Sequence, residues 1–545
     1  MSSKRILAIG IAGLIALSAC SKTGGDNGAG ARNSWTIPHT LRYATAEDIN
    51  SLNPHLTTQL VVNLMAQMTM AYLIKTDEHN GLIPELATEI PTKSNGGVSA
   101  DGLTITYHLR KGVTWSDGAP FDAQDVLFSI KTVLNKANNE TSTQGWDLID
   151  KMSAPDRYTV VLHLKKKYSP FVETFFSTAG ANPCILPKHL LAKYPNINNI
   201  PYNSKPIGIG PFKYDRWDRA QQVIMVANPT YWRGAPKLQK IVFKIIPDRN
   251  TTLAQLQSHE IDLWYPIPGA YYPRAKAISG YTVLKQPGFI INHWDFNVKH
   301  PRVAELAVRQ ALRLAMDRAT LIKKIGHGIG IVQDIPAPRT AVYFDPDIKN
   351  VPFDIPAANA LLDKAGWKRG ADGIRAKNGI ALNLDVASST GSTDVDEQIE
   401  LVRSWWKQIG VSMNVKRYAS PQMFAQAQSG GVVYGNDWDV VFLAWGLDAI
   451  GDYSSIYGCQ SVPPNGQNNL RWCDAKAQAA MDAVYGDYEQ SERNRDVRGL
   501  FEAFVADAPS IVTSLREDVY AYNSDLKNFH PNGVSPFDNM MDVDI

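Results

Sequence analysis

The cysteines are the residues whose chemistry depends most on the compartment, and the chain has four of them. Cys459 and Cys473 are close in sequence, and in an oxidising compartment such a pair is the natural disulfide. On the chain-entropy model, closing so short a loop stabilises the fold by about 3 kcal/mol. Cys184 would then be a lone thiol, which we expect to be buried and inert.

The N-terminal residues predict that the chain is exported. Lys4 and Arg5 precede an uncharged apolar run over residues 6–17, which is too short to span a bilayer and reads as part of a signal peptide over residues 1–19. The following Leu-Ser-Ala-Cys matches the bacterial lipobox, which implies that Cys20 becomes the acylated first residue of the mature protein. The alternative is an ordinary signal peptide that happens to contain a cysteine.

The rest of the chain is neutral and without a second long apolar run. Residues 20–34 contain almost nothing apolar and predict a flexible tether. Loss of residues 1–19 removes two of the 55 basic residues and leaves a balance with the 53 acidic ones. A neutral surface gives no support for nucleic-acid binding. A chain of 545 residues is too long for one core, so we expect two or three domains.

Catalytic and metal-binding motifs are weak in this sequence. There is no Gly-x-Ser-x-Gly and no Walker loop, and His259-Glu260 is not followed by the second histidine of a zincin. The glycines over residues 326–330 lack the spacing of a dinucleotide fingerprint. His293 or His327 could touch nickel or haem in a metal-carrying protein, but each is more often a polar loop residue. We therefore predict no enzyme, no resident metal and no cofactor.

The elements that must position a site alternate between strand and helix. Residues 104–109 and 158–164 have the strand period, and Asp122 with Asp125 three residues on predicts a helix N-cap. Further strands are predicted over residues 222–226, 241–246, 261–265, 382–386, 411–416 and 438–444, and helices over 251–257, 303–315, 395–409 and 421–428. Such alternation predicts α/β lobes, with helices packed on sheets and a cleft between the lobes.

Several collinear segments resemble the family 5 extracellular solute-binding proteins, the dipeptide-, oligopeptide- and nickel-binding components of ABC importers. The central one covers residues 99–121 and reads Ser-Ala-Asp-Gly-Leu-Thr-Ile-Thr-Tyr-His-Leu-Arg-Lys-Gly-Val-Thr-Trp-Ser-Asp-Gly-Ala-Pro-Phe. Others lie at residues 51–55, 185–189, 208–212, 228–236, 308–312, 315–318 and 360–367. One departure is His259, where members usually have Gly, at a helix end that asks for a left-handed residue.

The resemblance implies a type II periplasmic binding protein fold, with two lobes around a cleft plus an extra small α+β domain. The expected domain I is discontinuous and comprises residues 35–82, 206–295 and 512–545. Domain II would span residues 83–205 and domain III residues 296–511. The implied partners are a peptide ligand, an ABC permease with its ATPase subunits, and the membrane through the lipid on Cys20. We expect a monomer that faces the periplasm, or the outer face of the plasma membrane in a Gram-positive cell.

Ligand contacts are implied by the same resemblance. In peptide-binding members a Trp-x-x-Asp places a carboxylate against the ligand's ammonium group, and Trp445 with Asp448 has that spacing. The alternatives are that Asp448 caps the following turn and that Trp445 is ordinary core. Strand addition of the peptide would use the backbone around Ala444, Gly446 and Leu447.

A second backbone segment and one further tryptophan complete the expected site. The segment of Thr58, Gln59 and Leu60 would also pair with the peptide backbone. Trp294 either lines the cleft or packs at the hinge.

The expected ligand is a peptide that is not restricted to dipeptides. Dipeptide specialists carry an arginine that binds the ligand carboxylate, and residues 387–393 contain none. The alternatives are a haem, nickel-chelate, opine or sugar ligand on the same scaffold, or a sensory or adhesive lipoprotein without transport.

Overall fold

The computed structural model describes residues 32–143, 145–180, 184–390, 392–425, 430–447 and 451–545. The predicted signal peptide, Cys20 and residues 21–31 of the tether lie outside the described residues, and so does Asp448.

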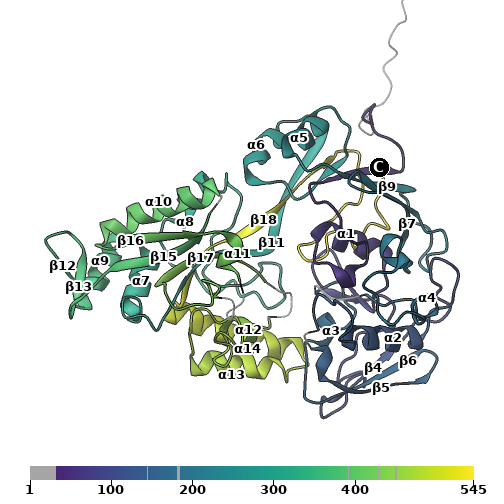
Figure 1. Cartoon of the computed structure of the whole chain (residues 1–545), viewed down its shortest axis with the longest axis horizontal. Coiled ribbons are helices and arrows are strands. Elements are labelled where there is room, and N and C mark those ends of the chain that lie inside the picture. The colour runs from purple at the N-terminus through teal and green to yellow at the C-terminus, as the bar shows by residue number, and fades with distance from the viewer. Residues whose placement is uncertain (1–31, 144, 181–183, 391, 426–429, 448–450) are drawn as a thin grey trace, which may run out of the picture.

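Two lobes share one sheet, which has ten strands within the described residues in the order β16-β15-β17-β11-β18-β10-β1-β9-β8-β7. The long strands β11 (Tyr281–Phe296) and β18 (Ser510–Asn523) pair antiparallel and run from one lobe into the other (Figure 1). Their register shifts between Pro287 and Ile291, where the ribbon passes between the lobes. This crossing makes β11 and β18 the connection about which the lobes can move.

The N-terminal lobe packs helices against the strands that precede β11 and against a C-terminal segment, residues 524–545. Its elements are β1 (Thr40–Thr45), α1 (Leu60–Thr69), β2 (Ile74–Thr76), β3 (Leu82–Pro84), β7 (Phe212–Asp218), β8 (Gln222–Ala227), β9 (Lys240–Ile245), α5 (Arg249–Gln257), β10 (Leu263–Trp264) and α6 (Tyr272–Lys276). Its main core joins Leu41 and Phe243 from the strands to Met65 from α1 and Phe537 from the C-terminal segment. The chain therefore returns to this lobe after building the other one.

A small α+β domain packs beside the N-terminal lobe (Figure 1). It contains β4 (Thr104–His108), α2 (Ala123–Leu134), β5 (Ile149–Asp156), β6 (Thr159–Leu164), α3 (Phe171–Thr174) and α4 (Lys188–Leu191). The predicted capping of α2 is confirmed, because the Asp122 side chain accepts from Gln124 N–H at 2.9 Å and Asp125 accepts from Asp122 N–H at 3.2 Å.

The C-terminal lobe covers the other end of the sheet with helices. Its elements are α7 (Leu306–Leu314), α8 (Arg318–Lys324), α9 (Ile355–Lys364), β12 (Lys368–Arg369), β13 (Arg375–Lys377), β14 (Ile380–Ala381), β15 (Asn383–Ser389), α10 (Thr393–Gln408), β16 (Ser412–Tyr418), α11 (Ser420–Met423), β17 (Val440–Gly446), α12 (Ser454–Tyr457), α13 (Ala475–Val484) and α14 (Gln490–Asp507). The helix predicted from residue 303 is shorter than expected, because α7 begins at Leu306. Of the helix predicted over residues 421–428, α11 covers residues up to Met423, and residues 426–428 lie outside the described residues.

The predicted disulfide and the predicted left-handed residue are both present. Cys459 and Cys473 are bonded, with their Cα atoms 4.8 Å apart, and Cys184 is a buried free thiol. His259 has φ +61°, a conformation that glycine adopts with less strain than other residues. Its ring stacks on Trp35 at 4.4 Å, a contact that offsets part of the backbone strain and that glycine could not make.

Candidate ligand-binding cavity

A cavity of about 1100 Å³ lies between the lobes. Leu60 and Gln67 line it from the N-terminal lobe, Asn292 and Arg516 from the crossing strands, and Phe424 from the C-terminal lobe. This volume slightly exceeds the usual range for sites of drug-sized ligands. The cavity therefore has room for a ligand of several residues or for a metal chelate.

The open edge of β17 borders the cavity. β15 pairs with β17 at Val440 and Val441, and within the described residues no strand continues that ladder. Beyond that point Ala444, Trp445, Gly446 and Leu447 line the cavity. The sheet is thus left unfinished where the two lobes face each other.

The ladder geometry tells which backbone groups point to that edge. Leu447 N–H donates to the Phe289 carbonyl at 2.7 Å, and Gly446 pairs with Ile290. In an antiparallel ladder, residues that bond to the partner strand alternate with residues that point away. Ala444 and Gly446 therefore direct their N–H and C=O groups away from β11. Both residues are exposed, and nothing lies within 4 Å of the place a Cβ on Gly446 would occupy.

Trp445 has both of the roles that the sequence allowed, core residue and cavity wall. Its side chain is half-buried and packs against a cluster that contains Ile291 and Leu515, while the residue also lines the cavity. Leu447 is half-buried beside it. Trp445 is thus both core and wall.

The segment before α1 contributes a side chain to the cavity wall, but few free backbone groups. Leu60 lines the cavity. Gln59 caps α1, so its carbonyl accepts from Val62 and Asn63 N–H at 3.1 Å, and its own N–H donates to Thr57 Oγ1 at 3.2 Å. In this arrangement the backbone N–H and C=O of Gln59 already have local partners, so pairing of Gln59 with a ligand strand stays a prediction. Thr58 is exposed and does not belong to the cavity lining.

Trp294 does not line the cavity. Its side chain is 0% exposed and packs against Trp406 and Phe442, with ring centroids 5.5 and 5.4 Å away. The residue lies on the face of β11 that α7 and α10 cover in the C-terminal lobe. Packing beside the crossing strands is the role that this position favours.

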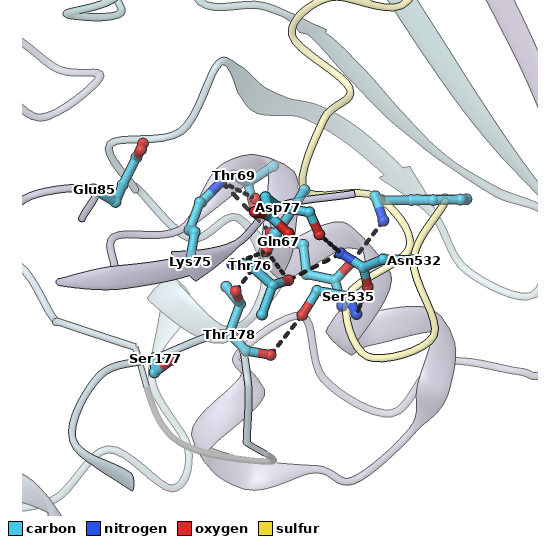
Figure 2. Close-up of polar contacts among 12 residues, drawn as sticks. Gln67, Thr69, Lys75, Thr76, Asp77, Glu85, Ser177, Thr178, Asn532 and Ser535 are labelled. Atoms are coloured by element: carbon cyan, nitrogen blue, oxygen red, sulfur yellow. Dashed lines mark hydrogen bonds and ion pairs between the residues drawn. The ribbon is translucent and has the colours of Figure 1, made fainter. Parts of the chain in front are cut away.

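The wall on the N-terminal lobe is fixed by the buried polar network in Figure 2. Lys75 donates to the Gln67 carbonyl at 2.8 Å, and its ammonium lies 3.7 Å from the Asp538 carboxylate. Burial raises the pKa of Asp538, while Lys75 opposes that rise. Ser535 Oγ donates to the Thr178 carbonyl at 2.6 Å. Because Gln67 and Thr178 line the cavity, the C-terminal segment holds this wall in place.

Two charged residues of β18 belong to the cavity and were not among the residues predicted from the sequence. Arg516 and Asp518 both line the cavity, and Arg516 donates to Asn292 Oδ1 through Nε at 3.1 Å and Nη2 at 2.9 Å. The alternation of β18 could have placed both side chains on one face, but only the fold shows that this face borders a cavity.

Neither a metal-binding cluster nor a membrane-spanning helix is found in the part of the chain that the structure describes. No group of three His, Cys, Asp or Glu side chains within the described ranges is placed to hold a metal ion. In the same part of the chain, none of the helices combines the length and apolar character needed to cross a membrane.

The comparison with protein families decides the classification. The model of the bacterial extracellular solute-binding proteins, family 5 Middle, matches residues 81–467. The chain belongs to this family. The solute-binding protein is therefore a non-enzymatic component of an ABC importer that works outside the cytoplasmic membrane, in the extracellular space or the periplasm.

Proteins similar to this solute-binding protein are named for, or were solved with, different ligands. It is 25% identical over 448 residues to the oligopeptide-binding protein AppA of Bacillus subtilis (strain 168), which covers 81% of this chain and 80% of AppA. The structure of AppA with a nonapeptide matches at TM-score 0.70 and 23% identity, over 92% of this chain and 98% of that one. NikZ from Campylobacter jejuni with Ni(L-His) matches at TM-score 0.72 and 25% identity, over 94% and 100%.

Proposed function

We propose that this solute-binding protein captures peptides in the cavity between its lobes and delivers them to the permease and ATPase subunits of an ABC importer. The open edge of β17 is the observation that carries the proposal. Among the described residues, the outward backbone groups of Ala444 and Gly446 have no partner, and a chain of unknown sequence could add there as a strand. Main-chain bonds ignore side-chain identity, so such a site suits peptides of mixed sequence.

Asp448 is the proposed partner of the peptide's ammonium group. The residue lies outside the described residues, and the proposal rests on its spacing from Trp445. Trp445 supports it by lining the cavity. An ammonium group enclosed between two lobes needs a compensating charge, because an unpaired buried charge is costly.

The lipid on Cys20 would keep the protein beside its permease. Residues 20–34 would act as the tether. Tethering turns the meeting of receptor and permease into a near-intramolecular event with a high effective concentration.

A nickel chelate is the second candidate ligand, because NikZ and this chain share a fold and NikZ was solved with Ni(L-His). A chelate that brings its own donor atoms would not need a protein metal cluster. It would, however, make little use of an extended row of strand-edge groups at Ala444 and Gly446.

Calorimetry with N-methylated peptides tests the proposed function. Tetra-alanine is compared with three versions, each methylated at one amide nitrogen, which removes one backbone donor and leaves the side chains unchanged. Strand addition predicts that alternate positions lose about tenfold or more in affinity, while the positions between them lose little. Uniform losses, or binding of nickel–histidine without any peptide binding, would contradict the proposal.

A further inference from the structure

Two opposite charges lie on one face of β18 where it crosses between the lobes. Arg516 and Asp518 are two residues apart, so their side chains leave the strand on the same side. Both line the cavity. Within the described residues, however, no ion pair joins Arg516 to Asp518 or to any other carboxylate.

Arg516 is oriented by a neutral group. Asn292 Oδ1 accepts from Nε and Nη2 of Arg516, and Asn292 Nδ2 donates to Ser514 Oγ at 3.2 Å. The amide of Asn292 therefore fixes the guanidinium without neutralising it. By contrast, the inward-facing Arg42 and Arg318 each have a carboxylate at 2.7 Å.

Arg516 is exposed to the open cavity and Asp518 is half-buried, and the surrounding protein still disfavours both charges. Desolvation lowers the pKa of Arg516 and raises the pKa of Asp518 to about 7, the latter opposed by Arg516 and Tyr265. A guanidinium still keeps its proton at neutral pH. The cavity thus contains a fixed cation whose remaining N–H donors lack an anionic partner.

The titratable and charged groups next to Asp518 can be named. Tyr265 and Tyr520 face it, together with Arg516 on its own strand. Gly288 leaves room for its carboxylate, since a Cβ there would lie 3.0 Å from Asp518 Oδ2. The neighbouring Glu517 also lines the cavity, and its carboxylate pairs with Lys285 at 3.1 Å.

We infer that Arg516 binds a carboxylate of the ligand and that Asp518 acts as its internal competitor. The inference rests on the proposed peptide function and adds a preference for acidic ligands. The carboxylate could be the C-terminus of the peptide or an acidic side chain, because the guanidinium fork recognises both in the same way. Asp518 lies beside the fork and would repel that carboxylate when it is ionised.

The competition gives binding a pH dependence. Above about pH 7, Asp518 is an anion that partly neutralises Arg516 and repels the ligand's carboxylate. Below that value Asp518 is protonated, and the ligand meets an uncompensated cation. Preference for carboxylate-bearing peptides is therefore expected to rise as the pH falls from 8 to 6.

The experiment measures that preference with matched peptides. One arm compares tetra-alanine with its C-terminal amide. The other compares tetrapeptide amides that carry Glu with those that carry Gln at positions two, three and four. Wild-type protein should prefer the carboxylate by about ten- to hundredfold in one of the arms, which identifies the source.

Two variants should move the preference in opposite directions. Arg516→Gln should abolish it, Asp518→Asn should raise it several-fold at pH 8 and remove its pH dependence, and Arg417→Gln, on the β16 edge strand, should change nothing. A stronger preference for the carboxylate cannot result from misfolding. Asp518→Asn therefore tests the inference even if Arg516→Gln does not fold. Retained preference in a folded Arg516→Gln, or a fall in Asp518→Asn, would overturn the inference.

The failure of the inference and the failure of the proposed function give different results. Wild-type protein that binds the peptides without preferring a carboxylate overturns the inference alone. Wild-type protein that binds none of them overturns the peptide function, and the inference falls with it.

Discussion

The hydroxyl of Tyr488 donates to the carbonyl of Gly102 at 2.5 Å and joins the C-terminal lobe to the small domain. Tyr488 follows α13 and is 9% exposed, buried in the core of the small domain. Beside it, Ser169 Oγ donates to the Val484 carbonyl at 2.6 Å. The C-terminal lobe is therefore connected to the rest of the molecule by this contact as well as by the β11–β18 ribbon, and α13 and α14 lie beside α3 in Figure 1.

Tyr488→Phe is expected to favour a more open arrangement of the lobes. The change removes the bond to Gly102 and the acceptor for Tyr168 N–H, each worth about 1 kcal/mol. Spin labels at Lys111 and Lys349 should report a larger population of long distances in the ligand-free variant. Tyr158→Phe, in the same domain, should leave the distances unchanged. An unchanged distribution in Tyr488→Phe would show that the contact does not hold the lobes together.

Reduction of the Cys459–Cys473 disulfide is expected to destabilise the C-terminal lobe by about 3 kcal/mol, because the bond closes a short loop. Gln467 within that loop lines the cavity, so ligand binding should weaken as well. Urea denaturation with and without reductant measures the first effect. A Cys459→Ser/Cys473→Ser double variant should be insensitive to reductant. Equal midpoints for the oxidised and reduced wild type would refute this expectation.

The buried pair of His55 and Glu140 predicts a loss of stability at alkaline pH. Burial alone would lower the pKa of His55, but the Glu140 carboxylate at 3.0 Å and the Cys184 carbonyl at 2.8 Å outweigh it and raise that pKa to about 10. The unfolded value is about 6.5. The contribution of His55 is therefore complete below about pH 6.5 and is lost as the pH rises through 10.

Denaturation between pH 6 and 10 measures this slope. His55→Gln should flatten it, whereas His79→Gln, which alters an exposed histidine, should not. A slope that is the same in His55→Gln and wild type would assign the alkaline loss to other groups.

Asp448→Asn tests the proposed ammonium contact. Removing the charge should weaken tetra-alanine by about ten- to hundredfold and N-acetylated tetra-alanine hardly at all, because the acetylated peptide has no ammonium group. Calorimetry with both peptides gives the comparison. Equal losses for both would remove Asp448 from this role.

Local chemistry explains which features could be predicted from the sequence. The Asp122 cap and the Cys459–Cys473 pair depend on neighbours in sequence, and so does the left-handed His259 at a helix end. The segment after α11 contacts a part of the chain that local sequence does not specify, since the carbonyl of Met423 accepts from Val433 N–H at 3.1 Å.

The site depends even more on tertiary structure. The sequence pattern did not indicate that the backbone carbonyl of Gln59 would cap α1. The pattern also did not indicate that Trp294 lies on the buried face of β11 or that Arg516 lies on the face of β18 that borders the cavity. Those outcomes depend on how two lobes pack around one shared sheet.

Mass spectrometry of the ligand that co-purifies with the protein shows directly whether the cavity between the lobes binds peptides. Native spectra before and after denaturation give the mass of whatever occupies the cavity. Strand addition along β17 predicts released peptides of mixed sequence and several lengths, because main-chain bonds select for backbone and not for side chains. A single species that is a nickel chelate, a haem or a sugar would contradict it.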